Sequence, residues 1–184
     1  MSGTGKDVGD PVYIAAQIVG FVAVGTFLLS YQLKQRKHIV FVNAVSSVLY
    51  VVQYALLGAF DGAVIDTISA VSTLAATRKE NTRIKKYAGI LIVAFDLTIF
   101  AAGMALYRNV FSLCSIAGAI LQVSALWLSK ERDIRLVSFL GAPCWLVFNL
   151  SSHAYGAALG SFLSMVSIAS AIYRYDIAPT RERK

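Results

Sequence analysis

The sequence predicts an all-α integral membrane protein with seven transmembrane helices. Three observations predict this class. First, 57% of the 184 residues are hydrophobic and 15% are charged, whereas soluble domains are about 45–50% apolar and about 25% charged. Second, the charges avoid a series of apolar segments, each near the ~20 residues that a bilayer crossing needs. Third, basic residues gather in alternate connections, as membrane topology requires.

The seven segments follow one another with short connections. We expect them at Tyr13–Leu33, Ile39–Leu57, Phe60–Ala76, Ala88–Tyr107, Val110–Leu128, Leu136–Ala154 and Gly156–Tyr173. The turns from the second segment to the third and from the sixth to the seventh are the tightest. Each pair of segments joined by such a turn should therefore form an antiparallel helical hairpin.

The basic residues predict the orientation. With the N-terminus outside, only Lys6 and Arg108 lie outside, and the other 15 of the 17 Lys and Arg residues lie inside. This asymmetry supports seven crossings with an N-out, C-in topology. It also explains the net charge of +7 without a nucleic-acid partner.

The chain repeats itself at an offset of roughly 94 to 98 residues. The stretch Gln17–Ala23 resembles Ser115–Leu121, and basic loops follow both. We therefore expect two parallel three-helix repeats joined by a linker helix, a 3+1+3 plan. The expected divisions are a flexible segment 1–11, a first repeat 12–77, a basic loop and linker helix 78–108, a second repeat 109–174 and a basic tail 175–184.

Polar side chains form stripes on the hairpin helices. In the second segment they follow helical spacing from Asn43. The sixth segment repeats this pattern around Trp145 and Asn149, and ends at His153. An apolar helix with one polar stripe is expected to turn that stripe toward other helices or water. The stripe of the second segment consists of Asn43, Ser46, Ser47, Tyr50, Gln53 and Tyr54.

Two acids lie within the apolar segments. Asp66 is either a cation, proton or substrate site, or a structural acid bonded to Gln53 or Tyr50 across the hairpin, because an isolated carboxylate in lipid is costly. Asp96 lies on the linker helix. A hydrogen bond to a Ser or Thr of a neighbouring helix is its simpler interpretation, and an ion site is the alternative.

Aromatic and small residues leave similar alternatives. Trp145 beside Asn149 suits a sugar, nucleoside or vitamin, although Trp also serves in packing. His153 is better interpreted as an interfacial residue than as a ligand. Gln17 and Gln122 either line a lumen or bridge helices. For the small residues of the seventh segment, Gly156, Gly160, Ser164, Ser167 and Ser170, close helix packing is the simpler account.

These features resemble the SWEET, SemiSWEET and PQ-loop superfamily and the PnuC vitamin transporters. Within that group, Gln17-Ile-Val-Gly, Ser30-Tyr31-Gln32, Leu56-Leu57-Gly58-Ala59 and Gly62-Ala63 resemble the bacterial inner-membrane YgjV family. The resemblance implies a Pro-Gln hinge near Gln32, but the proline is absent here. It implies pocket positions at Trp145 and Tyr50, with Asp66 near a position that is Asn in those relatives.

Together these observations predict a multi-pass protein of the bacterial inner membrane that transports a small polar solute by alternating access. Tyr50, Gln53, Tyr54, Asp66, Trp145 and Asn149 would bind the solute, Gln17, Gln32, Asn43, Gln122 and His153 would line the pocket or gate, and Asp66 or Asp96 would couple ions. The alternative is a non-transporting receptor, scaffold or assembly protein.

Other functions find no support in the sequence. It shows no GxSxG, HExxH or Walker-type motif, so we expect no enzyme. No cofactor or metal is expected either, because Cys114 and Cys144 lie in apolar runs without metal-ligand spacing. The expected partners are the bilayer and the solute, and homo-oligomerisation stays open.

Overall fold

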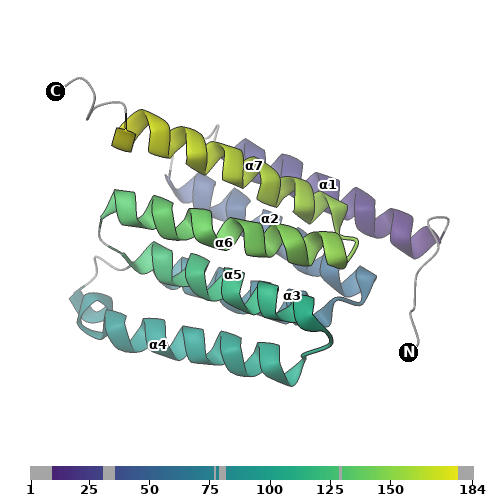
Figure 1. The fold of residues 1–184 in the computed structure, drawn as a ribbon, viewed down its shortest axis with the longest axis horizontal. Helices are drawn as coiled ribbons and strands as arrows, with labels where there is room; N and C mark the ends of the chain where they lie inside the picture. The colour runs from purple at the N-terminus through teal and green to yellow at the C-terminus, as the bar shows by residue number, and fades with distance from the viewer. Residues whose placement is uncertain (1–9, 31–35, 77, 79–81, 129, 178–184) are drawn as a thin grey trace.

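A computed structural model describes residues 10–30, 36–76, 78, 82–128 and 130–177. These residues form an all-helical protein (Figure 1). The helices are α1 (Pro11–Ser30), α2 (Arg36–Leu57), α3 (Phe60–Ala76), α4 (Thr82–Ala105), α5 (Val110–Trp127), α6 (Glu131–Ser151) and α7 (Tyr155–Ile172), and a short π-helix, η1 (Tyr173–Ile177), continues α7.

The predicted helices are present with nearly the predicted bounds. The bounds of α3 are those predicted, whereas α2, α4 and α6 begin several residues earlier, at Arg36, Thr82 and Glu131. The physical reason is that hydropathy marks where a helix enters an apolar medium. The hydrogen-bonded backbone continues outward into the basic connections, where charged side chains reach water.

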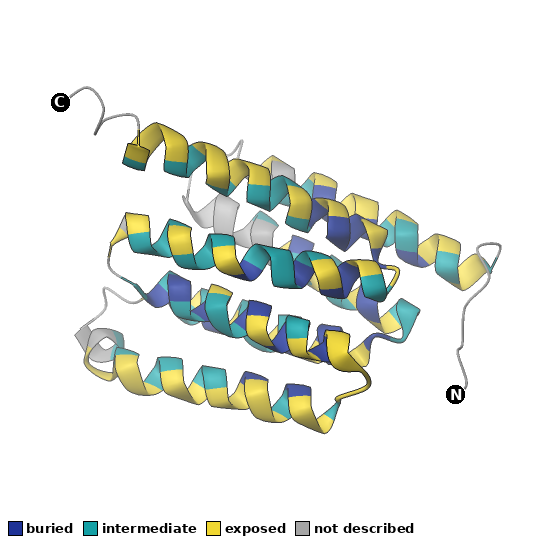
Figure 2. Cartoon of the chain, viewed as in Figure 1, coloured by how far each residue is buried: buried dark blue, intermediate teal, exposed yellow. Residues whose placement is uncertain are grey.

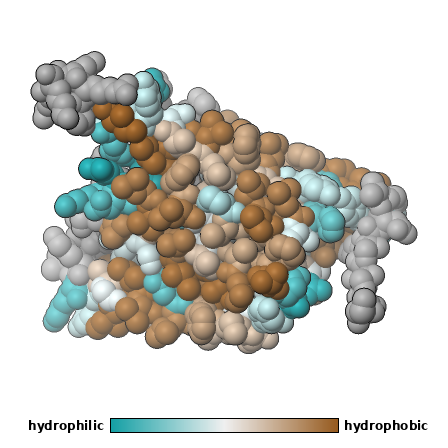
Figure 3. Space-filling model, in the orientation of Figure 1, coloured by the Kyte–Doolittle hydropathy of each residue, from teal (hydrophilic) through white to brown (hydrophobic). Residues whose placement is uncertain are grey.

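Four helical stretches within the described residues are long and apolar enough to cross a membrane. They are Lys86–Ala105, Val110–Trp127, Arg132–Ser151 and Tyr155–Ile177. The apolar parts of α1 and α2 are shorter, and α3 has 17 residues. In the face shown in Figure 3, hydrophobic side chains fill the middle and hydrophilic ones gather toward the two ends, which is the pattern of a protein embedded in lipid.

Six helices form a closed ring in which neighbours pack in the order α1, α2, α3, α5, α6, α7 and back to α1. Helix α4 lies outside this ring, against α3 and α5. Figure 2 shows α4 as the most exposed of the helices at that side of the bundle. The packing is therefore symmetric: α5, α6 and α7 have the same relations to their neighbours in the ring as α1, α2 and α3 have to theirs.

The two tight turns have the same backbone geometry. Gly58 (φ 73°) and His153 (φ 55°) each adopt the left-handed conformation that ends a helix. The next residue donates a backbone hydrogen bond to the carbonyl five positions earlier, Ala59 to Tyr54 and Ala154 to Asn149, at 2.8 and 2.9 Å. Gly58 adopts this conformation without strain, whereas His153 carries a side chain in it.

Candidate functional site

A cavity of about 130 Å³ lies inside the ring of helices. All six ring helices contribute to its wall, and α4 does not. The wall extends along α7 from Ala157 to Ile168, which at 1.5 Å per residue is about 16 Å. It therefore begins near the tight turn before α7 and continues toward the opposite end of the bundle, where α2, α4 and α6 carry basic residues in their first turns.

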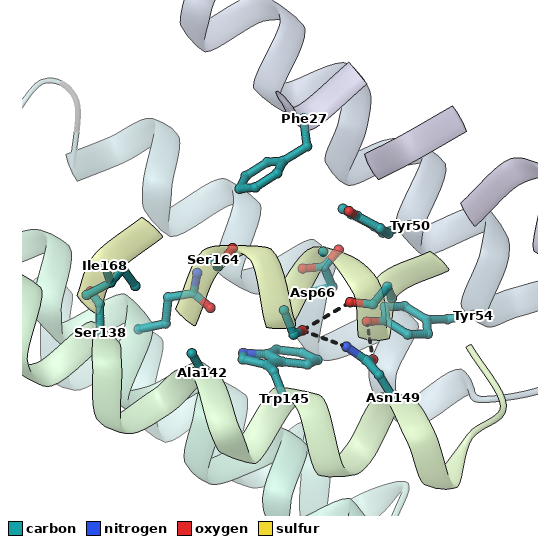
Figure 4. Close-up of a pocket in the computed structure, with 14 residues that line it drawn as sticks. Phe27, Tyr50, Tyr54, Asp66, Ser138, Ala142, Trp145, Asn149, Ser164 and Ile168 are labelled. Carbon is teal, nitrogen blue, oxygen red and sulfur yellow. Dashed lines mark hydrogen bonds between the residues drawn. The ribbon is translucent and has the colours of Figure 1, made fainter. Parts of the chain in front are cut away.

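Most of the predicted binding residues meet at this cavity. Tyr50 and Tyr54 reach it from α2, Asp66 from α3, and Trp145 and Asn149 from α6 (Figure 4). Gln122 of α5, predicted as a pocket or gate residue, also lines it. The helical stripes on two distant hairpins thus converge on one space.

A chain of hydrogen bonds crosses the end of the cavity nearest the tight turns. The Tyr54 hydroxyl donates to Asn149 Oδ1 at 2.7 Å, and Asn149 Nδ2 donates to the Ser161 hydroxyl at 3.0 Å. Tyr54 and Asn149 occupy corresponding positions, each four residues before the left-handed residue of its turn. Trp145 and Phe148 pack beside Tyr54, with ring centroids 6.5 and 6.0 Å from it. This layer closes the cavity at that end.

Two buried polar atoms at the cavity have no partner among the described residues. Asp66 Oδ2 and Trp145 Nε1 are buried and make no hydrogen bond with any described residue. The sequence offered Gln53 as a structural partner for Asp66, but both polar side-chain atoms of Gln53 are also without a partner. The Asp66–Gln53 bond is therefore absent.

Gln53 is the predicted binding residue that lies away from the cavity wall. Its side chain is fully buried against α1, where a methyl group added to Gly20 would overlap it. The neighbouring stripe residue Tyr50 turns the other way, and its hydroxyl oxygen lies 2.5 Å from where a Cβ on Gly160 would stand. Helix α1 thus covers the edge of the stripe that holds Gln53, and the edge that holds Tyr50 faces the cavity.

The remaining predicted residues lie elsewhere. Gln17 Nε2 donates to the His153 carbonyl at 2.7 Å, so these two residues join α1 to the turn before α7. Asp96 accepts a 2.8 Å hydrogen bond from Ser124 of α5 through Oδ2. This confirms the predicted interhelical bond of Asp96, which is outside the cavity. Gln32 and the side chain of Asn43 lie outside the described part of the chain.

Several wall residues were not among the predicted binding or gate residues. Ser138 and Ala142 share the polar stripe of the sixth segment, and Gly160 or Ser161 falls near the pocket Asn position that the resemblance implies for the second repeat. Phe27 had no sequence signal, and Ser164 was expected to pack helices. The small residues of α7 do both, because small side chains leave space beside the helix where they lie. Pro143, next to the wall residue Ala142, lies inside α6, and its missing N–H leaves the carbonyl four residues earlier without a helical partner.

Beyond the hydrogen-bonded layer, the helices are locked together at the turn end. We call this region the closed end and define it by three contacts that join α1–α3 to α5–α7 or to the connections at their ends, beside the Gln17–His153 bond. The Ser112 hydroxyl donates to buried Asp61 at 2.6 Å, and the Arg108 guanidinium donates to the Gly58 carbonyl. Gly156 packs directly on the backbone of Gly20. The polar groups of these contacts are paired, unlike Asp66 Oδ2 and Trp145 Nε1 at the cavity.

Comparison with known proteins identifies relatives in bacterial inner membranes. The family model Imp-YgjV, described as bacterial inner membrane protein, matches residues 14–178. The chain is 26% identical over 159 residues to "Inner membrane protein YgjV" of Escherichia coli K12, an alignment that covers 83% of this chain and 81% of that protein. No solved structure matches the chain.

Proposed function

The chain belongs to the YgjV family of bacterial inner membrane proteins, and from that premise we propose that it transports a small polar solute by alternating access. The observation that carries this proposal is the cavity, which lies between α1–α3 and α5–α7 and is lined by polar side chains from both. A membrane protein that encloses unpaired polar groups between two halves has the elements of a solute carrier.

The two halves support the proposal through their correspondence. Their turns share one backbone geometry. Helices α1, α2 and α3 also pack in the ring in the same order as α5, α6 and α7. We interpret the halves as two parallel repeats, with α4 as the linker that keeps them parallel. Relative rocking of such repeats would open the cavity to one side and then to the other.

The chemistry at the two ends suggests which state the structure represents. Basic residues gather at the end toward which the cavity extends, so we assign that end to the cytoplasm. The tight turns then face the periplasm, where the Tyr54–Asn149 bond and the closed end block the path. In this assignment the structure is closed to the periplasm. Pro143 interrupts the hydrogen-bond ladder of α6 beside the wall, where bending costs least.

The cavity size favours a small solute. Its volume of about 130 Å³ is close to the roughly 150 Å³ of an engineered cavity that admits benzene. It is well below the roughly 300 Å³ at which pockets for drug-sized ligands begin. Among the expected classes, this volume favours the smallest solutes over nucleosides.

A cysteine-accessibility experiment tests alternating access without knowledge of the solute. Cys114 and Cys144 are free thiols, so both are first replaced by alanine. Ser164→Cys then places one thiol on the cavity wall, and Phe162→Cys places one on the exposed side of the same helix. A membrane-impermeant maleimide is applied to spheroplasts and, separately, to inverted membrane vesicles.

We expect the thiol at position 164 to react from both sides, because the cavity opens alternately. The thiol at position 162 faces lipid and should react from neither side. Reaction of the position-164 thiol from a single side would overturn transport and favour the receptor or scaffold alternative.

A further inference from the structure

The described residues of the cavity wall include an acidic side chain and no basic one. Asp66 is the one ionisable acid among the described wall residues, and these include no Lys, Arg or His. Its Oδ2 is buried without a hydrogen-bond partner. In a low-dielectric site an uncompensated carboxylate attracts a cation strongly and repels an anion. An anionic solute would meet no positive group here, whereas a cation would meet its counter-charge.

The surroundings of Asp66 suit an organic cation. Figure 4 shows its carboxylate among the side chains of Tyr50, Tyr54 and Trp145. Aromatic faces attract ammonium groups through their quadrupole, more strongly where water is excluded. A bare metal ion would need several oxygen ligands, and no cluster of three or more potential metal-binding side chains occurs among the described residues.

A second buried group without a partner calls for a hydrogen-bond acceptor on the solute. Trp145 Nε1 is a donor without a partner, and an indole N–H can only donate. The indole nitrogen points toward Ala142, away from Asp66 (Figure 4). A solute that satisfies both groups therefore carries a cationic donor at one point and an acceptor oxygen at another.

We propose that the cavity binds a small amino alcohol, with its ammonium group on Asp66 and its hydroxyl oxygen accepting from Trp145 Nε1. The volume of about 130 Å³ holds such a molecule. This assignment rests on the proposed transport function, since it names the solute class of the same site. It disfavours sugar acids and amino acids, because their carboxylates would meet no positive group among the described wall residues.

Four probes of similar size separate the two requirements. Ethanolamine carries both groups, ethylamine carries the cation only, ethylene glycol carries hydroxyls only, and glycine adds a carboxylate. The full chain is reconstituted in nanodiscs at pH 7, and binding is followed by thermal shift and by calorimetry. We expect ethanolamine to raise the unfolding midpoint most, ethylamine to raise it less, and ethylene glycol and glycine to leave it unchanged.

Matched variants locate the two contacts. Asp66→Asn should abolish ethanolamine binding, and Trp145→Phe should weaken it by about tenfold, since each lost charge-assisted or donor contact is worth roughly that factor. Asp61→Asn, on the same helix, and Trp127→Phe, at a tryptophan equally buried, should retain the wild-type affinity. The shift of each variant is measured against its own ligand-free midpoint, so a loss of stability does not obscure binding.

The outcomes separate this assignment from transport itself. Absence of an ethanolamine shift, an equal shift with glycine or ethylene glycol, or binding that survives Asp66→Asn would each overturn the amino-alcohol assignment. If position 164 still reacts from both sides, transport stands with another solute. If ethanolamine binds through Asp66 while position 164 reacts from one side only, the solute class stands and transport falls.

Discussion

Five residues apart on α3, Asp61 and Asp66 lie in opposite surroundings. Asp61 belongs to the closed end, where it accepts a 2.6 Å hydrogen bond from Ser112. Asp66 faces the cavity with one buried oxygen unpaired. The two tryptophans of the ring repeat this contrast, since Trp127 donates to Ser72 at 3.2 Å and Trp145 Nε1 has no partner.

The contrast distinguishes structural polar groups from groups available for a solute. A buried polar group that is paired within the protein contributes to stability, and an unpaired one costs free energy until something binds it. The Asp61–Ser112 and Arg108–Gly58 contacts of the closed end are of the first kind, and Asp66 Oδ2 and Trp145 Nε1 at the cavity are of the second. The same substitution should therefore have different consequences in the two regions, and paired variants test this.

The largest expected effect is at the Gly20–Gly156 contact of the closed end. A Cβ on Gly156 would overlap backbone atoms of Gly20, so Gly156→Ala forces α1 and α7 apart. We expect a loss of about 3 kcal/mol, the upper part of the overpacking range, measured as a lower thermal unfolding midpoint in detergent.

The control for Gly156→Ala is Gly25→Ala on α1, where no described atom lies within 4 Å of the added methyl group. This variant should be neutral or slightly stabilising, because alanine favours the helix. An equal drop of the unfolding midpoint in the two variants would contradict the view that close packing of Gly156 on Gly20 holds α1 and α7 together.

The aspartate pair comes next in size. Asp61→Ala leaves the buried Ser112 hydroxyl without its acceptor, which should cost about 1–3 kcal/mol. Asp66→Ala removes an acceptor that already lacks a partner, so stability should hold or rise. Chemical denaturation of both variants in mild detergent measures the difference. A larger loss for Asp66→Ala would reveal a structural role and contradict the division between the two regions.

The tryptophan pair gives the smallest effect. Both indoles are 7% exposed, so replacement by phenylalanine removes similar buried surface. Only Trp127→Phe also breaks a hydrogen bond between side chains, and such bonds in membrane proteins average about 0.6 and reach about 1.7 kcal/mol. We expect Trp127→Phe to be less stable than Trp145→Phe by that amount in parallel thermal scans. Equal stability would indicate that the Trp127–Ser72 bond contributes nothing.

Much of the site was predictable because helical periodicity is a local property. The spacing from Tyr50 to Tyr54 and from Trp145 to Asn149 predicted two stripes, and the hairpin turns predicted which helices would be neighbours. Periodicity did not predict which edge of a stripe another helix would cover. Gln53 has the same spacing as its neighbours, but α1 covers it, because Gly20 lets the two helices approach closely at that level.

The sequence by itself determined the helices, their apolar character, the basic end and the correspondence of the two hairpins. These follow from composition and from contacts within a few residues. Only the tertiary structure decided that Asp61 is paired and Asp66 is not, and that Tyr54 meets Asn149 across 95 positions of sequence. A hydrogen bond between two helices forms only when their rotation about their axes and their relative shift along them place donor and acceptor within about one ångström of the required distance. No pattern along a single helix carries that information.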